Sequence, residues 1–371
     1  MFWILLEIFV FQSKCALQCV NPNGNPVDWY MMIKTATQSG APSSCIRNGT
    51  AYTYIDSTTS KLVFLNKDIT QTDSPLGRTL LPLYKSQTDL VFMYNDETPD
   101  GKTSSSYGHT KGVISYSQNQ GFWLVHSVPA FPPPPDREYS FSSKGRQYGQ
   151  SFLCLSLDAN NLNTVGILQQ HNHPQIYYSK ISSNAQTQMP ELAKAMNGSF
   201  VGRTPATAIR DIVTRGGQKF RGYGKNAPWG KDLAPNLIVP DINADMIWET
   251  WMRPYEKPFC PPRPAKQCLS SSLLSGPIEG GGEYKWKETE DHSKWGISAE
   301  RKVPVTCIGD INRMSSQRKR GGGAVCINNS KIHSMFYSLI LNTDSCNGPS
   351  DVIPYGFFRK TYRAFRNLFS K

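Results

Sequence analysis

Two copies of one short motif in this chain could together cleave a phosphodiester bond. His109-Thr110-Lys111 lies in the first half and His292-Ser293-Lys294 in the second. In an extended strand, residues i and i+2 project from the same face, so each copy offers an imidazole beside an ammonium. An imidazole can attack phosphorus or protonate a leaving group, and an ammonium can hold an anionic oxygen. One copy would mean little, but one per half suggests a shared site that needs no metal.

Further polar residues follow each motif at a similar distance. His126 ends the strand expected after Lys111, and Gly309-Asp310-Ile311-Asn312 follows Lys294 on the next expected strand. If the halves share a fold, His126 and Asn312 occupy related positions. Asn312 could orient an imidazole or a phosphate oxygen. His126 could instead be a hydrogen-bonded strand histidine, and Asp310 is expected to be structural.

The elements that must position these residues alternate between strands and short helices. β-Branched and aromatic content predicts strands at 27–34, 90–94 and 151–157, and a hairpin from 112–116 and 121–126 around residues 117–120. A further strand is expected at 305–312. Helices are expected at 188–197 and 241–251, with loops and one strand across 204–223. This alternation makes the fold class α/β or α+β.

Charge and length narrow the function classes. The 371 residues are enough for one large domain or two halves, and 39% hydrophobic content describes a globular chain. The net charge of +12, from 40 Lys+Arg against 28 Asp+Glu, favours a polyanionic partner. Nucleic acid, anionic lipid and glycosaminoglycan all meet that description.

The two ends and the cysteines indicate the secretory pathway. Residues 2–11 are apolar apart from Glu7 and predict a signal peptide over 1–16, with an apolar first strand or helix as the alternative. The eight cysteines after Cys15 are scattered and form no CxxC pair, which favours disulfides over a zinc site. Three N-glycosylation sequons, at Asn48, Asn197 and Asn328, fit the same route. Residues 349–371 predict a basic amphipathic helix that packs on the body, lies on an anionic membrane or contacts DNA.

Two other stretches have a functional and a plain interpretation. His171-Asn172-His173 lacks a third ligand nearby for a metal and is expected to be a surface loop. The run Arg318-Lys319-Arg320-Gly321-Gly322-Gly323 could cradle phosphate through its backbone N–H groups. A solvated turn before Cys326 explains that run equally well.

The complete set of motifs resembles the deoxyribonuclease II family, within the phospholipase D-like superfamily. The resemblance runs from about Leu17 to Gly348 and is weak from Gln169 to Ala265. The motifs that carry it are Leu17-Gln18-Cys19, Gly24-Asn25-Pro26-Val27-Asp28-Trp29, Gly77-Arg78-Thr79-Leu80, Tyr94-Asn95-Asp96, residues 108–113, residues 121–129, Tyr148-Gly149-Gln150, Asp291-His292-Ser293-Lys294-Trp295, residues 309–313 and Arg320-Gly321-Gly322-Gly323.

The resemblance implies a fold and an activity. The fold would be a phospholipase D-like pseudo-twofold, in which two αβα halves with mixed sheets, 17–175 and 176–348, share one central active site. The activity would be acid endonuclease cleavage of DNA without metal or cofactor, leaving 3′-phosphate ends, in lysosomes or secretions. From the residue types, one histidine attacks phosphorus and the other protonates the 5′-oxygen, with His109 favoured as the nucleophile. A histidine of ordinary pKa is protonated in an acid organelle, which predicts an acid optimum.

The resemblance also assigns individual residues. His109, Lys111, His292 and Lys294 match the paired catalytic motifs, and His126 matches a further family histidine. The implied disulfides are Cys19–Cys154, Cys268–Cys346 and Cys307–Cys326, leaving Cys45 and Cys260 to pair with each other. The chain departs from the pattern at a few positions. Tyr116 and Ala299 stand where full phospholipase D motifs have Asp, and Gly296 replaces an expected cysteine.

Three hypotheses therefore remain. The first is an active acid nuclease, which the two intact motifs favour. The second is a catalytically weak or inactive secreted family member that binds DNA or another polyanion. The third, a phospholipase D-like lipid enzyme, is disfavoured by the nuclease motifs around the pair.

Overall fold

A computed structural model describes residues 17–59, 61–85 and 88–347. The predicted signal peptide at 1–16 and the amphipathic tail at 349–371 lie outside the described residues. Two nine-stranded sheets and seven α-helices make up the described chain, so the α+β class is confirmed. Among these residues, no helix combines the length and apolarity needed to cross a membrane.

The first sheet is built largely from the first half of the chain and is antiparallel at every pairing between its described strands. In spatial order its strands are β11 (Ile176–Ile181), β7 (Leu90–Asn95), β8 (Lys111–Ser117), β9 (Gln120–His126), β10 (Gln150–Leu157), β3 (Trp29–Lys34), β4 (Tyr52–Thr53) and β6 (Phe64–Leu65), with β5 (Ile55–Asp56) also paired to β3. A small separate sheet pairs β1 (Cys19–Val20) with β2 (Pro26–Val27).

The second sheet comes from the rest of the chain and contains one parallel pair, β14 with β15. In spatial order its strands are β12 (Thr207–Val213), β13 (Lys219–Lys225), β19 (Gly322–Asn328), β18 (Val305–Gly309), β17 (Trp295–Ser298), β14 (Met246–Glu249), β15 (Cys268–Pro277) and β16 (Glu283–Lys287), with β20 (Ile340–Thr343) paired to β15.

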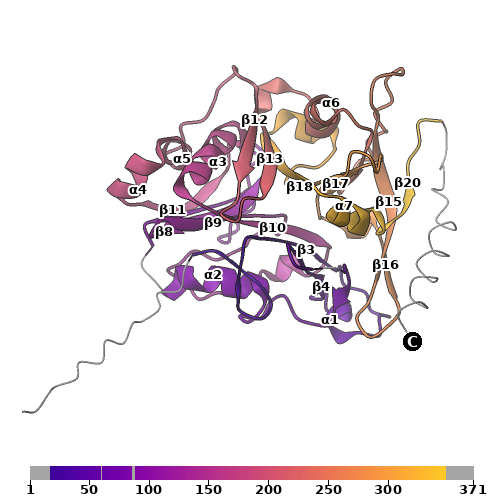
Figure 1. Cartoon of the computed structure of the whole chain (residues 1–371), viewed down its shortest axis with the longest axis horizontal. Helices are drawn as coiled ribbons and strands as arrows, with labels where there is room; N and C mark the ends of the chain where they lie inside the picture. Colours follow the sequence, from indigo (N-terminus) through magenta and orange to yellow (C-terminus); the bar gives the residue numbers. More distant parts are fainter. Residues whose placement is uncertain (1–16, 60, 86–87, 348–371) are drawn as a thin grey trace, which may run out of the picture.

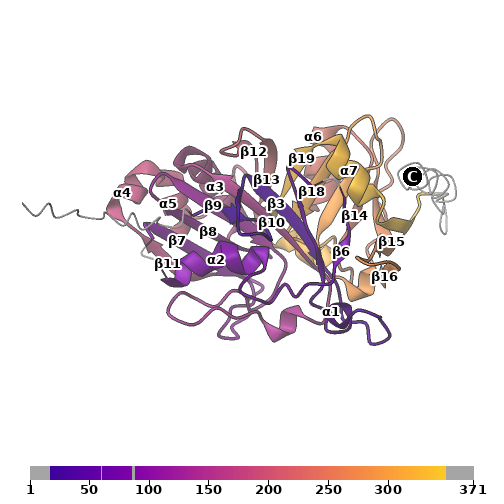
Figure 2. The ribbon, with the colours of Figure 1, turned by 60° about the horizontal axis from the view of Figure 1, so that its bottom comes forward.

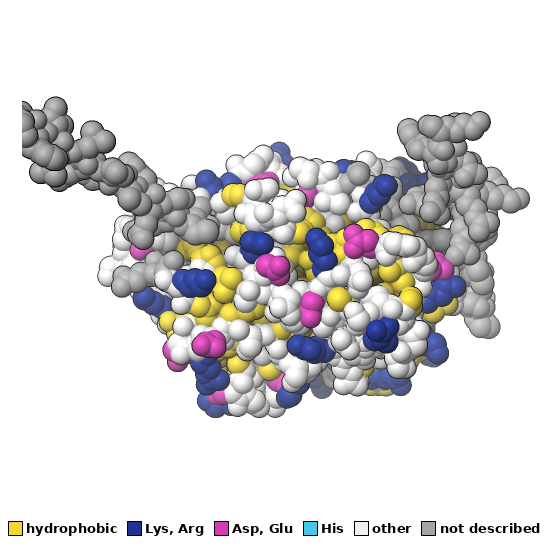
Figure 3. All heavy atoms as spheres, turned by 90° about the horizontal axis from the view of Figure 1, so that it is seen from below, with side chains coloured by type: hydrophobic (Ala, Val, Ile, Leu, Met, Phe, Trp, Pro, Cys, Tyr) yellow, Lys and Arg dark blue, Asp and Glu magenta, His cyan; other side chains and the backbone are white. Residues whose placement is uncertain are grey.

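The helices cover the sheets and fill the space between them (Figures 1 and 2). One apolar cluster joins side chains of both sheets to those of α3, α5 and α7, while a second lies under the first sheet with α2. The helices are α1 (Ser44–Arg47), α2 (Pro75–Lys85), α3 (Ala159–Asn172), α4 (Ser183–Gln188), α5 (Pro190–Met196), α6 (Val239–Ile242) and α7 (Ser330–Tyr337). On the face below the first sheet, Lys and Arg are dispersed among apolar patches, and no histidine is visible among the described side chains drawn there (Figure 3).

Local sequence explains the elements that matter for the site. The β8–β9 hairpin turns at Gln118 and Asn119, which both have positive φ, as a two-residue turn between twisted strands requires. Helix α3 begins where the Asp158 carboxylate accepts the Asn161 N–H and ends at His173, which adopts the left-handed conformation. A Cβ on Gly166 would lie 2.3 Å from the backbone of α5, so glycine allows the two helices to touch.

Most predicted strands and the 188–197 helix are confirmed, but two segments differ from expectation. The helix predicted at 241–251 is wrong. α6 stops at Ile242, because Asn243 turns into the left-handed region, and Met246–Glu249 becomes a strand between β15 and β17. Residues 204–223, expected to hold one strand, contain β12 and most of β13, paired as a hairpin. Pairing within the large sheet outweighs the ambiguous local pattern in both places.

The disulfides correct one prediction. Cys19–Cys154 and Cys307–Cys326 form as expected, but Cys346 bonds to Cys260 instead of Cys268. The Cys268 side chain belongs to an apolar cluster under the second sheet and is fully buried as a free thiol. Cys260 lies in the neighbouring loop and reaches Cys346, so the predicted Cys45–Cys260 pair is also wrong and Cys45 is free.

Candidate active site

The two His-x-Lys motifs meet at one cavity of about 590 Å³. It is lined from both halves of the chain, and the lining includes five of the six predicted site residues: His109, Lys111, His292, Lys294 and Asn312. Other lining residues are Asp96, Glu97, Thr103, Ser104, Ser105, Ser127, Pro129, Trp251, Met314, Gln317 and Arg320. His126, the sixth, is fully buried and does not line the cavity.

Each motif is held by backbone from the other half. The His109 N–H donates to the Gly321 carbonyl at 2.9 Å, and the His292 N–H donates to the Gly149 carbonyl at the same distance. Gly321 directly precedes β19, and Gly149 directly precedes β10. Both histidines therefore lie just before their own strands, β8 and β17. The backbone of each is held by a glycine that precedes a strand of the opposite sheet.

His109 has a polar environment that fixes its ring. Its Nδ1 lies 2.6 Å from the Asp310 carbonyl oxygen, which can only accept, so Nδ1 carries the proton and donates. The lone pair is then on Nε2, which lies 3.8 Å from Oδ2 of Asp96. Burial lowers the pKa of His109 well below its ordinary value, although Asp96 opposes that shift. The ring is therefore a neutral base with a defined tautomer.

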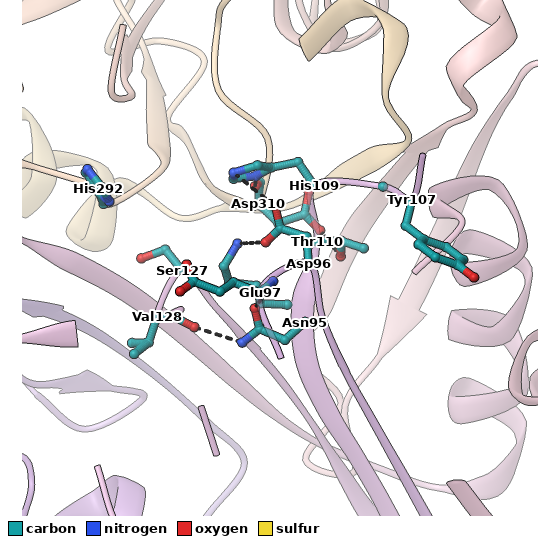
Figure 4. A network of polar contacts seen from close by, with 12 residues as sticks. Asn95, Asp96, Glu97, Tyr107, His109, Thr110, Ser127, Val128, His292 and Asp310 are labelled. Atoms are coloured by element: carbon teal, nitrogen blue, oxygen red, sulfur yellow. Dashed lines mark hydrogen bonds and ion pairs between the residues drawn. The ribbon is translucent and has the colours of Figure 1, made fainter. Parts of the chain in front are cut away.

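Asp96 connects three cavity groups, as Figure 4 shows for its place beside His109. One carboxylate oxygen accepts from the Lys111 ammonium, and the other lies 3.1 Å from Nη1 of Arg320. Burial alone would raise the pKa of Asp96, but Lys111, His109 and Arg320 together hold it well below its ordinary value. Asp96 therefore stays ionised through the acid range.

His292 is held by aromatic rings. It stacks on Tyr148 with ring centroids 4.1 Å apart and planes 3° from parallel, and Trp251 packs at 4.4 Å. Its Nε2 is buried and has no hydrogen-bond partner among the described residues. Burial, followed by Lys294, lowers the pKa of His292 to about 3. In Figure 4 it lies across the site from His109.

Lys294 is the more weakly compensated of the two lysines. Its ammonium donates to the carbonyl of His292 at 2.7 Å, and its backbone N–H donates to Oγ of Ser151 in β10 at 3.0 Å. Burial and then the nearby Lys111 lower the pKa of Lys294 to about 7, against the opposing effects of Asp96, Asp291 and Asp310. This ammonium is fully charged only under acid conditions.

The remaining predicted residues have distinct surroundings. Oδ1 of Asn312 is buried at the cavity without a partner among the described residues. Asp310 accepts from the Thr110 hydroxyl at 2.5 Å and the Gly323 N–H at 2.7 Å, and burial raises its pKa to about 6. His126 accepts the Val128 N–H on Nδ1 at 3.2 Å, and burial lowers its pKa to about 3.

The stretch His171-Asn172-His173 supports the site from behind. A Cβ on Gly108 or on Gly321 would lie 1.9 or 2.2 Å from the Asn172 carbonyl oxygen, so both glycines pack directly against the end of α3. The Gly108 N–H also donates to the His173 carbonyl at 2.7 Å. Within the described ranges, no cluster of three or more His, Cys, Asp or Glu side chains could hold a metal ion.

Four residues that pair with or pack against the motif side chains or Asp96 had no side-chain role assigned from sequence: Asp96, Tyr148, Trp251 and Arg320. Three of them lie inside motifs that carried the family resemblance, Tyr94-Asn95-Asp96, Tyr148-Gly149-Gln150 and Arg320-Gly321-Gly322-Gly323. Their place within these motifs could have identified them as candidate site residues from the sequence. Trp251 follows β14, in a segment mispredicted as helix, and nothing in the sequence indicated it.

Comparison with known proteins gives one consistent result. A family model described as Deoxyribonuclease II matches residues 18–346. Among curated proteins, Deoxyribonuclease-2 of Caenorhabditis elegans is 33% identical, covering 92% of this chain and 97% of its own length. Plancitoxin-1 of Acanthaster planci is 30% identical over 92% and 96%. Deoxyribonuclease-2-alpha of Sus scrofa is 30% identical over 92% and 94%.

Proposed function

The chain belongs to the deoxyribonuclease II family and is thus a DNA-cleaving hydrolase, and we propose that it is an acid endonuclease that needs no metal. The observation that carries the proposal is the convergence of both His-x-Lys motifs on one cavity. The product would be a 3′-phosphate end, formed through a covalent phosphohistidine.

The proposed attack begins at His109. Its Nε2 lone pair attacks phosphorus, the P–O5′ bond breaks, and the electron pair leaves with the 5′-oxygen, which takes a proton from His292. Support for these roles comes from the Asp310 carbonyl, which leaves only Nε2 of His109 free to attack. Lys111 and Lys294 stabilise charge on the non-bridging oxygens.

The second step releases the product. Water attacks the phosphohistidine phosphorus, giving its proton back to His292, and the P–N bond breaks to free the 3′-phosphate. For the first step His292 must already carry a proton, but its pKa of about 3 disfavours the protonated form in the free protein. A bound phosphodiester anion favours the imidazolium, and so does acid pH.

Asn312 and His126 have supporting parts in this proposal. The unpartnered Oδ1 of Asn312 faces a cavity where it can accept from the imidazolium of His292 or from bound water. His126 acts through its packing against Phe131 and Phe152 and its bond to Val128, without touching the substrate.

We also propose that the two halves are related by a pseudo-twofold. The order β8-β9-β10-α3-β11, which runs just past the first half, parallels β17-β18-β19-α7-β20 in the second, and each motif lies at the start of the first strand of its series. The reciprocal His109–Gly321 and His292–Gly149 backbone bonds support the same relation. The halves differ at the last strand, since β11 pairs with β7 whereas β20 pairs with β15.

The covalent structure supports a proposal about the compartment. Three disulfides among the described cysteines are typical of an oxidising environment. We therefore propose that the chain enters the secretory pathway and works in lysosomes or secretions. Contact of the basic segment 349–371 with anionic membrane is a separate proposal, tested by binding to phosphatidylserine vesicles with and without that segment.

Plasmid digestion tests the central proposal. Purified protein is incubated with supercoiled plasmid at about pH 5 and pH 7.5, each with excess chelator, and the ends are labelled to find which carries phosphate. We expect cleavage at pH 5 that survives chelator and leaves 3′-phosphate. Cleavage that requires Mg²⁺ would overturn it, and DNA binding without cleavage would favour the polyanion-binding alternative. Phosphatidylcholine, tested in parallel, should stay intact.

A further inference from the structure

A carboxylate, that of Asp96, lines the cavity where an anionic substrate is expected to bind. Asp96 lines the cavity together with His109, Lys111, Lys294 and Arg320. A fixed negative charge in that position repels a phosphodiester at short range, where Coulomb interactions are strongest. The presence of the Asp96 carboxylate beside these cationic side chains therefore needs a specific explanation.

The contacts of Asp96 are those that a phosphate group would make. One oxygen accepts from Lys111, and the other faces Nη1 of Arg320 at 3.1 Å and Nε2 of His109 at 3.8 Å. Two oxygens on one centre, held by two cations and facing the nucleophilic nitrogen, reproduce the two non-bridging oxygens of a phosphodiester. The carboxylate thus occupies the anion position of the free site.

Arg320 is built to present one donor there. Its Nε donates to the Tyr107 carbonyl at 2.9 Å, and its Nη2 donates to the carbonyls of Ser104 and Gly108, each at 3.1 Å. These bonds, from the second half to the loop before His109, fix the guanidinium plane. Nη1 alone is directed at Asp96, which makes it a prepositioned anion contact.

The backbone below Asp96 is equally fixed. The Asn95 amide donates to the carbonyls of Val128 and Phe131 at 3.0 and 2.9 Å, and the Asn95 N–H donates to Gln175. Figure 4 shows Asn95 and Val128 anchoring the chain beside the network. An incoming anion can therefore replace the carboxylate if the Asp96 side chain turns, without any movement of the strand.

We propose that Asp96 is a resident anion that occupies the scissile-phosphate position of the free site, and that the phosphodiester displaces it and takes over Lys111 and Arg320. Arg320 becomes a third cationic contact to the phosphate, beside the two motif lysines. The inference rests on the proposed function for the identity of the anion. Since Asp96 is ionised throughout the acid range, displacement occurs by exchange of anions and not by protonation.

Binding of inorganic phosphate tests this without any DNA cleavage. Calorimetric titration at about pH 5 compares the wild-type protein with Asp96→Asn and Glu97→Gln. Glu97 also lines the cavity but pairs with Lys144 at the surface, so its variant removes the same charge from a neighbouring position. We expect Asp96→Asn to bind phosphate about tenfold more tightly, and Glu97→Gln to change affinity less than about twofold.

Unchanged or weaker phosphate binding by a folded Asp96→Asn variant would overturn the proposal. Equal tightening in both variants would also overturn it, because that result reflects net charge alone. A crystal structure of the wild-type protein with phosphate guards against misfolding of the variant. We expect phosphate between Lys111 and Arg320 with the Asp96 side chain turned away; phosphate bound elsewhere, with Asp96 unmoved, contradicts it. Neither readout depends on whether the protein cuts DNA.

Discussion

The two His-x-Lys motifs have the same residue types but very different surroundings. At His109 the neighbours are polar and charged, and Asp96 balances both the imidazole and Lys111. At His292 the neighbours are the rings of Tyr148 and Trp251, and the Lys294 ammonium donates to the backbone carbonyl of His292. The first motif is therefore compensated electrostatically by a direct ion pair, whereas the second is compensated only weakly, by carboxylates that are not paired to its ammonium.

This difference in surroundings allows the two copies of the His-x-Lys motif to take different chemical roles. Hydrogen bonding to Asp310 fixes the tautomer of His109, which suits a nucleophile that must present one lone pair. Stacking orients the His292 ring without occupying Nε2, which suits a group that gains and loses a proton. Two identical side chains acquire different roles when their environments push them apart, as in other acid–base pairs.

Exchanging the leaving group is the strongest test of these roles. On DNA, His109→Asn and His292→Asn should each lose about 10³-fold or more in cleavage rate. With thymidine 3′-(4-nitrophenyl phosphate), nitrophenolate replaces the 5′-oxygen and needs no proton. We expect this substrate to restore most of the rate of the first nitrophenolate release in His292→Asn, seen as a burst of absorbance before slow turnover, and none in His109→Asn. Restoration in His109→Asn instead would reverse the assigned roles.

Lys294 should set the alkaline limit of activity. Its pKa of about 7 means that the ammonium is lost as pH rises through neutrality. Lys294→Met should lower kcat at pH 5 by about 10²-fold. Lys294→Arg, which stays charged, should have a reduced rate but should lack the additional fall above pH 7 that loss of the Lys294 charge adds to the loss of protonated His292. The measurement is a pH–rate profile from pH 4 to 9. An unchanged alkaline limb in Lys294→Arg would assign that limb to another group.

The same lysine should affect stability in the opposite direction. Its pKa is about 7 in the folded protein against an ordinary value of 10.5, so the unfolded chain binds the proton more tightly. Stability from this group therefore rises with pH between those values, and the charged form opposes folding at pH 5. Lys294→Met should raise the Tm at pH 5 by roughly 2–5 °C, measured by calorimetry. A lower Tm would show that burial does not penalise this ammonium.

The sequence was sufficient for the motifs but not for their environments. His109, Lys111, His292, Lys294 and Asn312 could be identified because each motif is local and its chemistry depends on residue type. The contacts of Arg320 join residues from different halves, and Asp96 reaches His109 and Lys111 from another strand end, so no local pattern contains them. The choice between Cys260 and Cys268 as the partner of Cys346 depends on which side chain faces the core, which spacing along the chain does not determine.

Removing the Tyr148 ring that stacks on His292 should impair proton transfer by the second motif and leave the first motif unchanged. Tyr148 contacts His292 by stacking and does not line the cavity. Tyr148→Leu should lower kcat on DNA about tenfold with little change in KM, because a loosely held ring spends less time aligned with the leaving oxygen. Tyr148→Phe keeps the ring and should behave like the wild type. A loss in the Phe variant equal to that in the Leu variant would mean that the hydroxyl, not stacking, matters.

The smallest effect on kcat is expected for His126. It pairs with Phe152 across β9 and β10. Under the proposed pseudo-twofold, the matching pair is Gly309 opposite Ala324, so Gly309 and not Asn312 would correspond to His126, and the second half would have no equivalent imidazole. The His126 ring also packs at 5.5 Å from Phe131. Because it is fully buried outside the cavity, His126→Gln should lower kcat less than about tenfold and lower the Tm by several degrees. A loss of kcat as large as that of His109→Asn, with an unchanged Tm, would instead place this histidine in contact with the substrate.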